Sequence, residues 1–380
     1  MMKVINEKLH HEVIYFPRYK ELGSPTANRT SDNGCFDLLP KELKLHIFSF
    51  LDFYSLVQCS QVSRLFRETA ADPTLYTRVN LKPLFHLACN QTLKYLTSRS
   101  SLLRHLDMSR CGNYGKITPV VWRTFLYARG SKLTNLVLAN CHVSTPSVLQ
   151  ALCSTCKNLV DLDLSNNHIL DSVAYGPMFQ LEKLQQLNLY RTQVDTRSLS
   201  FFLSHAKALQ SLKIGACANI NGDEISASIA QNCPNLVALD MWRCTTLTGR
   251  GVSSLSTLEN LEDLDLGWCT NVLASTGCIQ ALVSSCTRLK VLLLTAHRQT
   301  SATDLDAIAS SLSGTLTQFS CMGSRNIQPE AITNLASKCQ NLELLDISYC
   351  DQLEGSSLHR QLCVLLPSCH VVTSKYMGTL

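Results

Sequence analysis

The chain has 380 residues, of which 45% are apolar and 17% are charged. This composition is typical of a globular protein and excludes a wholly disordered chain. The 34 basic and 29 acidic residues give a net charge of +5, which is too small at this length to require nucleic acid or a membrane surface as a partner. Because no run of 18 or more apolar residues occurs, we expect no membrane insertion.

Residues 1–34 are expected to form a flexible N-terminal segment. Residues 1–17 mix charged residues and histidines into their apolar positions and lack the continuous apolar core of a secretory signal. Turn-forming residues follow at 23–28 and 31–34. The 18 cysteines, about 5% of the chain, fall below the level of a disulfide-stabilised scaffold. Without a secretion signal, we expect reduced thiols in a cytosol-like compartment.

The next block, residues 35–80, predicts three short helices. The first runs from Pro40, which suits the first turn of a helix, to about Leu51. The others cover about 53–61 and 63–70, and Asp72-Pro73 breaks the last one. Apolar residues of the first helix spread over about 220° of its circumference, whereas one amphipathic seam needs little more than 100°. The excess apolar surface of this helix should be buried against the next helices, the following domain or a separate protein.

After a connector at 81–101, a tenfold repeat occupies residues 102–367. The frame Leu-x-x-Leu-x-Leu-x-x-(Cys/Asn/small) recurs every 25 to 30 residues. Its fourth and sixth positions alternate with polar ones, which indicates a strand with one buried face, and a helical stretch follows. One strand and one helix cannot bury their apolar faces alone, but stacked neighbouring repeats can. We therefore predict an α/β leucine-rich-repeat solenoid, a horseshoe with parallel strands on the concave side and helices on the convex side. The copies begin at Leu103, Leu133, Leu159, Leu184, Leu209, Leu236, Leu261, Leu289, Leu316 and Leu342.

Ten cysteines occupy two fixed positions of this repeat. Cysteine is small and readily buried, and its weak S–H donor can face turn carbonyls inside the stack. The pattern resembles the cysteine-containing subtype of leucine-rich repeats. Six hold the ninth position (Cys111, Cys141, Cys217, Cys244, Cys269, Cys350), and four lie three residues before a repeat start (Cys156, Cys233, Cys286, Cys339).

The block before the repeats contains Leu39-Pro40-x-Glu42-Leu43, Ile47-x-x-x-Leu51, Leu56, Val62-Ser63-Arg64-Leu65-Phe66 and Asp72-Pro73-x-Leu75-Tyr76. These segments resemble an F-box, with Phe66 and Tyr76 where the motif usually has tryptophan. An F-box followed by cysteine-type repeats is similar to the F-box/leucine-rich-repeat proteins. This resemblance implies that the F-box docks on the small adaptor of an SCF (adaptor–cullin–F-box) ubiquitin ligase, and through it on cullin and RING subunits. The repeats would recruit a protein substrate for ubiquitination and proteasomal degradation.

Eight residues of the F-box are expected to contact the adaptor. An interface of this type buries on the order of 1,600 Å² or more and is largely apolar. The alternative is a private three-helix core packed on the first repeat. In that case the chain is an interaction scaffold outside any ligase, and the helices only cap the solenoid. The eight residues are Leu39, Pro40, Leu43, Ile47, Leu51, Leu56, Val62 and Phe66.

A substrate site is predicted on the concave face of the middle repeats. Strand geometry points the third, fifth and seventh positions outward, and five of the ten fifth positions are aspartate. Asp240 and Asp265 would be adjacent like charges, which is destabilising unless a cation answers them. Aromatic residues and arginine carry most of the energy of many interfaces, so the patch should favour a basic and apolar partner. It comprises Tyr190, Arg191, Asp240, Trp242, Arg243, Asp265 and Trp268.

That patch has an internal alternative. Arg243 could pair with Asp240 and Asp265 within the protein, and the tryptophan rings could lie on neighbouring repeats.

We predict no catalytic residue, metal site or cofactor. Cys153-Ser154-Thr155-Cys156 matches C-x-x-C, but it falls late in a repeat helix rather than at an N-terminus that stabilises a thiolate. Two thiols without a second pair or a nearby histidine make a poor zinc site. His168, His205 and His297 belong to separate repeats. A non-enzymatic receptor is therefore expected, and an enzyme using Cys/His chemistry is the third interpretation.

Two further expectations concern the tail and the compartment. The C-terminal tail, 368–380, is expected to fray. The family resemblance places the chain in the cytoplasm or the nucleus. An association with mitochondria would follow only from resemblance to one member of the family.

Overall fold

The structure is a computed structural model that describes residues 34–111, 116–141, 145–167, 172–272, 277–353 and 356–373. The segment predicted to be flexible, apart from Gly34, lies outside the described residues, as do His168 and 374–380. The chain divides into two compact units, Met1–Leu162 and Asp163–Leu380. Among the described helices, none combines the length and the hydropathy that a membrane span needs.

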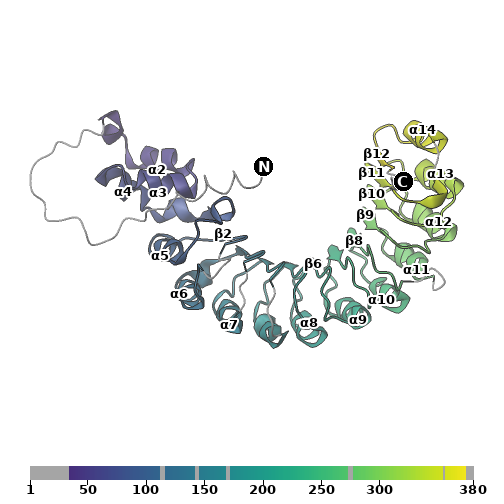
Figure 1. Ribbon diagram of the computed structural model, residues 1–380, viewed down its shortest axis with the longest axis horizontal. Helices are drawn as coiled ribbons and strands as arrows, with labels where there is room; N and C mark the ends of the chain where they lie inside the picture. Colours follow the sequence, from purple (N-terminus) through teal and green to yellow (C-terminus); the bar gives the residue numbers. More distant parts are fainter. Residues whose placement is uncertain are drawn as a thin grey trace, which may run out of the picture. The chain divides into compact units, whose positions relative to one another are not determined.

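The first unit begins with the three predicted helices, α2 (Lys41–Ser49), α3 (Phe53–Cys59) and α4 (Arg64–Ala70) (Figure 1). A 3₁₀-helix, η1 (Gly34–Leu38), precedes them, and a second 3₁₀-helix, η2 (Pro73–Tyr76), follows. Asp52 and Ser63 cap α3 and α4 by accepting hydrogen bonds from the backbone N–H groups of Ser55 and Phe66, at 2.7 and 3.2 Å. These caps fix where the second and third helices begin.

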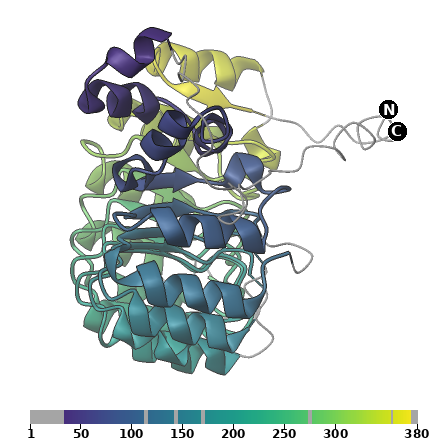
Figure 2. The ribbon, with the colours of Figure 1, turned by 90° about the vertical axis from the view of Figure 1, so that its left-hand side faces the viewer.

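A strand–helix stack completes the first unit. Its strands β1, β2 and β3 pair in parallel in chain order. Figure 2 shows α5, α6 and α7, in blue shades, running side by side. β1 was not predicted: it lies at the end of the block assigned to the F-box. The elements are β1 (Arg78–Asn80), η3 (Lys82–Leu84), α5 (Asn90–Arg99), β2 (His105–Asp107), α6 (Pro119–Arg129), η5 (Gly130–Lys132), β3 (Asn135–Val137), α7 (Pro146–Thr155) and β4 (Asp161–Asp163).

In the second unit, β5 to β12 form a parallel ladder in chain order. The strands of this unit line one edge and its helices line the other (Figure 1). The elements are η6 (Ser172–Gln180), β5 (Gln186–Asn188), α8 (Thr196–Leu203), β6 (Ser211–Lys213), α9 (Gly222–Asn232), β7 (Ala238–Asp240), α10 (Gly249–Leu255), β8 (Asp263–Asp265), α11 (Cys278–Ser285), β9 (Val291–Leu293), α12 (Ala302–Ser311), β10 (Gln318–Ser320), α13 (Pro329–Lys338), β11 (Leu344–Asp346), η8 (Asp351–Leu353), α14 (Ser356–Leu365) and β12 (His370–Val372).

The predicted solenoid of leucine-rich repeats is confirmed. Each of the ten frames contains a strand at its third to fifth positions, and the leucine that opens each frame is buried. Burying one such leucine stabilises the fold by about 1.5–3 kcal/mol. The prediction of a frayed tail is wrong for its first part, because His370–Val372 form β12 and pair with β11.

A tight turn ends most of the repeat strands. The side chain at the fifth position accepts a hydrogen bond from the backbone N–H at the seventh, as Asp240 does from Trp242 (2.9 Å) and Asp265 does from Gly267 (2.7 Å). The eighth residue then has a left-handed φ, 58° at Arg243 and 60° at Trp268, which disfavours side chains other than glycine. A hydrogen bond from its N–H to the next repeat, 2.7 Å for Arg243 to the Gly267 carbonyl, offsets this strain.

The prediction that the side chain at the seventh position points outward from the strand is wrong. The chain has left the strand there, so strand alternation no longer applies. Ser109, Ser165 and Ser348, all at the seventh position, are buried.

The ninth position forms a ladder of donors inside the stack, as predicted for cysteine. Cys217 Sγ donates to the Leu189 carbonyl (3.0 Å), and Cys269 Sγ donates to the Met241 carbonyl (3.2 Å), in each case one repeat back. The cysteines of the second fixed position are the C-caps of α7, α9, α11 and α13, namely Cys156, Cys233, Cys286 and Cys339. From Cys59 to Cys369, none of the described cysteines takes part in a disulfide.

Candidate functional site

The first candidate surface lies on the three N-terminal helices. Among the described residues, thirteen large apolar side chains are exposed, and five of them fall between residues 38 and 62. Such clustering marks an interaction site more often than scattered exposure does. The five are Leu38, Leu43, Ile47, Phe50 and Val62, with exposed fractions of 84, 48, 45, 77 and 69%.

Three of these residues form one stripe along α2 and its C-cap. Leu43, Ile47 and Phe50 are spaced i, i+4 and i+7, so they project from the same side of the helix. We call them the α2 stripe. Phe50 and Leu38 were missing from the predicted contact set, although Phe50 already belonged to the excess apolar face of the first predicted helix.

Part of the predicted contact set belongs to the interior instead. Leu56 is only 3% exposed and lies in the core with Val57. The Phe66 ring packs against those of Phe36 and Phe48, with centroids 4.8 and 5.4 Å apart. We therefore remove Leu56 from the candidate surface, because a side chain that closes the core offers nothing to a partner.

The remaining members are accessible in part. Pro40 is exposed, whereas Leu39 and Leu51 are half-buried.

The same helices also pack on the first repeat helix, α5. The rings of Phe53 and Tyr95 lie 6.0 Å apart, and the hydroxyl oxygens of Tyr76 and Tyr95 are separated by 3.4 Å. The Tyr76 hydroxyl donates to the Ala70 carbonyl at 2.7 Å, and burial raises the pKa of Tyr76. The helices therefore cap the repeats of their unit on one side, while the α2 stripe stays open.

The second candidate surface lies at the strand ends of the second unit. The rings of Tyr190 and Trp242 are 5.9 Å apart, although a whole repeat separates them in sequence. Gly215, at the same position of the intervening repeat, makes this approach possible. A Cβ there would lie 2.9 Å from the Tyr190 ring and 2.8 Å from Asp240 Oδ1. Gly267 likewise leaves space beside Trp242.

The left-handed residues of the turns form the rim of this surface. Arg191 and Arg243 are exposed, and Trp268 is 45% exposed. The Arg243 guanidinium lies 6.0 Å from the centre of the Trp242 ring. Among the described ion pairs, none joins Arg243 to Asp240 or Asp265. That part of the internal alternative is wrong, whereas the ring of Trp242 does lie against a neighbouring repeat.

Between the strand ends lies a hollow of about 360 Å³ on β6 to β10, which we call the acidic hollow. Asp240 and Asp265 face each other across β7 and β8 in register, with Lys213 next to Asp240 on β6. Asp263 and Lys213 were absent from the predicted patch. Asp263 holds a third position, and only fifth positions were examined for charge. Lys213 does hold a fifth position, but the patch was built from aspartates and from the aromatic and arginine side chains beside them. The lining residues are Ser211, Leu212, Lys213, Ala238, Leu239, Asp240, Asp263, Asp265, Val291, Leu293 and Gln318.

Burial and mutual repulsion make the carboxylates of the acidic hollow hard to ionise. The pKa of Asp265 is raised to about 6, mainly by burial and further by the charges of Asp240 and Asp263, against a hydrogen bond from Gly267. Burial also raises the pKa values of Asp240 and Asp263, and the charge of Lys213 opposes both shifts. These groups therefore meet an unfavourable charge environment at neutral pH.

Asp265→Asn is expected to stabilise the fold at pH 7.5. In the folded chain the pKa is about 6, above the ordinary 3.9, so the folded state binds this proton more readily and the carboxylate destabilises it above pH 6. Allowing for solvent screening of a half-buried group, the gain is about 1 kcal/mol. It should shrink as the pH falls from 6 toward 4. Thermal unfolding at pH 7.5 and pH 4.5 measures it.

Asp346→Asn is the matched control for that substitution. Asp346 holds the same position in β11 and also accepts a hydrogen bond from the N–H two residues on. Its partners in register are Ser320 and Val372, not carboxylates. A lower Tm for Asp265→Asn than for the unmodified chain at pH 7.5 would contradict the electrostatic account.

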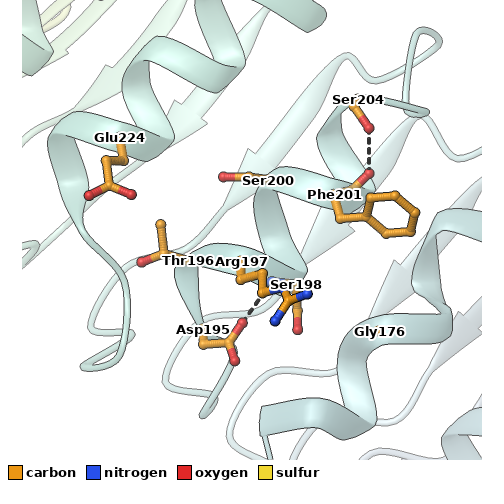
Figure 3. Close-up of a pocket in the computed structure, with 9 residues that line it drawn as sticks. All are labelled: Gly176, Asp195, Thr196, Arg197, Ser198, Ser200, Phe201, Ser204 and Glu224. Carbon is orange, nitrogen blue, oxygen red and sulfur yellow. Dashed lines mark hydrogen bonds between the residues drawn. The ribbon is translucent and has the colours of Figure 1, made fainter.

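A further hollow of about 1000 Å³ lies among η6, α8 and α9. Figure 3 shows its side chains spread around the rim, with Glu224 on one side and Phe201 on the other, instead of converging on one point. Asp195 there serves as the N-cap of α8, accepting a hydrogen bond from the Ser198 N–H at 2.7 Å. The arrangement supports no particular chemistry.

The C-x-x-C pair is buried. Burial raises the pKa of Cys153 to about 12 and that of Cys156 to about 11, opposite to the shift of a reactive thiol. Within the described residues, no group of three or more His, Cys, Asp or Glu side chains is arranged to hold a metal. His205 is exposed on the helix side and contacts Phe179 and Phe201, and His297 is buried in the ninth-position ladder.

Comparisons with family models agree with this division of the chain. Residues 36–82 match a model described as F-box-like. Residues 122–230 match a model of the leucine-rich repeats of an FBD-associated F-box protein.

Curated relatives show the same combination. Over 293 residues the chain is 34% identical to F-box/LRR-repeat protein 4 of Bos taurus, a match that covers 77% of this chain and 47% of that protein. It is 25% identical over 250 residues to F-box protein SKIP17 of Arabidopsis thaliana, covering 59% of this chain and 50% of the relative. The chain thus spans about half the length of these relatives.

A solved structure resembles the fold as well. A chain in the crystal structure of the yeast Rad7 and Elc1 complex superimposes with a TM-score of 0.56 at 16% identity, covering 90% of both chains. At that identity the likeness concerns the fold alone.

Proposed function

Because the chain is an F-box/leucine-rich-repeat protein, we propose that it is the substrate-recognition subunit of an SCF-type ubiquitin ligase. Its N-terminal helices bind the small adaptor, which brings the cullin and RING subunits. Its repeats bind a protein substrate that is then ubiquitinated for proteasomal degradation. The observation that carries this proposal is the α2 stripe, an apolar row that stays exposed while Phe48, Leu56 and Val57 of the same helices are buried in their core.

The adaptor surface comprises the accessible members of the predicted set together with the two residues that the prediction missed. A docking interface needs a central apolar anchor surrounded by a polar rim. The α2 stripe supplies the anchor, and charged residues such as Lys41 and Glu42 are exposed beside it. The proposed contacts are Leu38, Leu39, Pro40, Leu43, Ile47, Phe50, Leu51 and Val62, with Phe66 as a ring that supports them from below.

We place the substrate surface on Tyr190, Arg191, Asp240, Trp242, Arg243, Asp265 and Trp268. Trp268, Arg191 and Arg243 are exposed, and Tyr190 and Trp242 are half-buried; aromatic and arginine side chains of this kind are suited to hold a partner. The chain itself supplies no acid, base or nucleophile in this account. It holds the substrate beside the ubiquitin-charged enzyme and so raises its effective concentration there.

The proposed division of the chain keeps an F-box at 35–80, a connector at 81–101, ten repeats at 102–367 and a tail from 368. β1 and β12 add one strand before and one after the ten repeats. The absence of disulfides among the described cysteines from Cys59 to Cys369 suits a reducing compartment, and we assign the protein to the cytoplasm or the nucleus.

A scaffold outside any ligase is the second candidate, and one observation favours it. The contacts of Phe53 and Tyr76 with Tyr95 show that the helices cap the repeats of their unit, as end repeats require. A cap alone leaves the exposed α2 stripe unexplained, so adaptor binding separates the two functions.

Co-expression with an SCF adaptor tests the proposal. We expect the chain and the adaptor to purify as a 1:1 complex that stays together through size-exclusion chromatography. Adding the cullin–RING subunits should then enlarge the complex. A well-folded chain that elutes without the adaptor would support the scaffold function instead.

A further inference from the structure

We propose that the acidic hollow receives one lysine or arginine side chain of the substrate, while an apolar residue beside it in the same segment packs on Trp268 and on the Tyr190–Trp242 pair. This inference rests on the proposed function, in which the repeats recruit a protein. It adds the chemistry of the segment that they recognise.

Charge is the first argument. Three carboxylates, those of Asp240, Asp263 and Asp265, line the acidic hollow with a single cation, Lys213. Asp240 and Asp265 stand on adjacent strands in register, about 4.8 Å apart by strand geometry, where like charges repel. A ligand cation between them would relieve that repulsion and halve the net charge of the lining, from −2 to −1 with all three carboxylates ionised.

Shape is the second argument. A volume of about 360 Å³ is at the lower end of ligand pockets, which range over roughly 300–1,000 Å³, and so suits one long side chain better than a folded element. Leu239, Val291 and Leu293 contribute apolar atoms to the lining, while the carboxylates contribute charge. Lysine and arginine bury an apolar stem and keep a charged head, which matches this combination.

The surrounding rings supply the apolar contact. Trp268 is 45% exposed and lies on the turn that follows β8, three residues after Asp265. Gly215 and Gly267 leave room for the Tyr190 and Trp242 rings to lie close to the backbone. A partner side chain that reaches the hollow would pass over these aromatic faces.

The arginines on the turns beside the aromatic pair restrict further which substrate segment can bind. Arg191 and Arg243 are exposed on the turns beside Tyr190 and Trp242, so a second positive charge in the segment would be repelled there. Repulsion of wrong partners contributes to specificity as attraction does. The surface therefore suits one basic residue flanked by apolar residues better than a polybasic run.

Asp263→Asn is the most informative variant. Asp240 and Asp265 also hold turns through the N–H groups of Trp242 and Gly267, so their replacement could disturb the backbone. Asp263 lies in the middle of the lining at a third position and is exposed. Glu343→Gln is the matched control, because it removes one exposed negative charge from the same unit outside the hollow.

The experiment compares two fluorescein-labelled peptides bound to the full chain in complex with the adaptor. One is Gly-Leu-Phe-Arg-Leu-Phe-Gly, and the other carries citrulline, an uncharged isostere, in place of arginine. We expect fluorescence anisotropy to show at least tenfold tighter binding of the arginine peptide. Asp263→Asn should reduce this preference severalfold without weakening the citrulline peptide, and Glu343→Gln should leave it unchanged.

Equal affinities for the two peptides, or no binding of either up to millimolar concentration, would overturn the inference. So would an arginine preference that survives Asp263→Asn in folded protein. Adaptor retention is read in the same samples. If the complex keeps the adaptor but shows no arginine preference, the proposal for the acidic hollow is refuted and the proposed receptor function stands. If a chain that does not bind the adaptor shows the preference, the proposal for the hollow stands and the receptor function is refuted.

Discussion

Replacing Ile47 by aspartate is expected to abolish adaptor capture and to leave the fold intact. Ile47 is the middle member of the α2 stripe and is 45% exposed. At the centre of an apolar interface, the new carboxylate would have to be desolvated without a partner, which costs several kcal/mol. We expect the affinity for the adaptor to fall at least about a hundredfold, equivalent to about 3 kcal/mol.

Stability should change little, because an exposed position contributes little to the core. Surface substitutions usually lie within about 0.5 kcal/mol of the unmodified protein. Adaptor affinity is measured by calorimetry, and folding by the Tm of the same preparation. Phe50→Asp should behave like Ile47→Asp, which tests a residue that the sequence analysis left out.

Val364→Asp provides the matched control. Val364 is an exposed apolar residue of another helix, α14, with an exposed fraction of 76%. The same chemical change there should leave adaptor binding as it was. Normal adaptor binding by folded Ile47→Asp and Phe50→Asp variants would show that the α2 stripe is not the docking surface.

The strands of the ten frames could be predicted because each frame repeats the same burial problem. The first position is leucine in all ten frames and the fourth is leucine in nine, with Phe319 in the other, so chance cannot produce the pattern. β1 and β12 were not predicted because their buried members, Val79 and Val371, stand outside the leucine frame, although the strands themselves are as short as the others. A single apolar residue carries no periodicity, and only pairing with a neighbouring repeat makes it a strand.

The candidate surfaces could be predicted where the residue type alone determines which side chains are exposed. They could not be predicted where the backbone geometry determines it. The α2 stripe follows from helical spacing, and Phe50 was already on that face. The aspartates at the fifth position were interpreted as a charge ladder, whereas Asp107 and Asp346 cap turns by accepting backbone hydrogen bonds. The left-handed turn that carries Arg243 and Trp268 has no signature in those residue types, since glycine and asparagine are the usual occupants.

His297 is expected to be the side chain whose loss unfolds the second unit most readily. It occupies the ninth position, is 5% exposed, and its Nε2 lies 2.7 Å from the Leu266 carbonyl of the preceding repeat. Cysteines make the equivalent contact in other repeats. His297→Ala would leave a buried carbonyl without its donor and open a cavity, at a cost of about 3 kcal/mol. His297→Cys should cost less, because the thiol still donates.

The same residue should make the fold sensitive to acid. Burial lowers the pKa of His297 below 6.5, an effect that the Leu266 carbonyl and the charge of Asp304 oppose. The unfolded chain therefore binds this proton first as the pH falls, and the folded state loses stability below about pH 6.5. The contribution of Asp265 to the pH dependence has the opposite sign. Because its pKa is raised to about 6, the folded state gains stability as the pH falls through this range.

The two contributions separate in a double comparison. In an Asp265→Asn background, the Tm should fall steadily between pH 7.5 and pH 5. With His297→Cys added, most of that fall should disappear, because no buried imidazole remains to be protonated on unfolding. An identical pH dependence with and without His297 would mean that the folded and unfolded states bind this proton equally well, so that burial does not lower the pKa of His297. At pH 5 the ninth-position ladder would then have to hold a buried cation, which a single carbonyl acceptor is poorly able to stabilise.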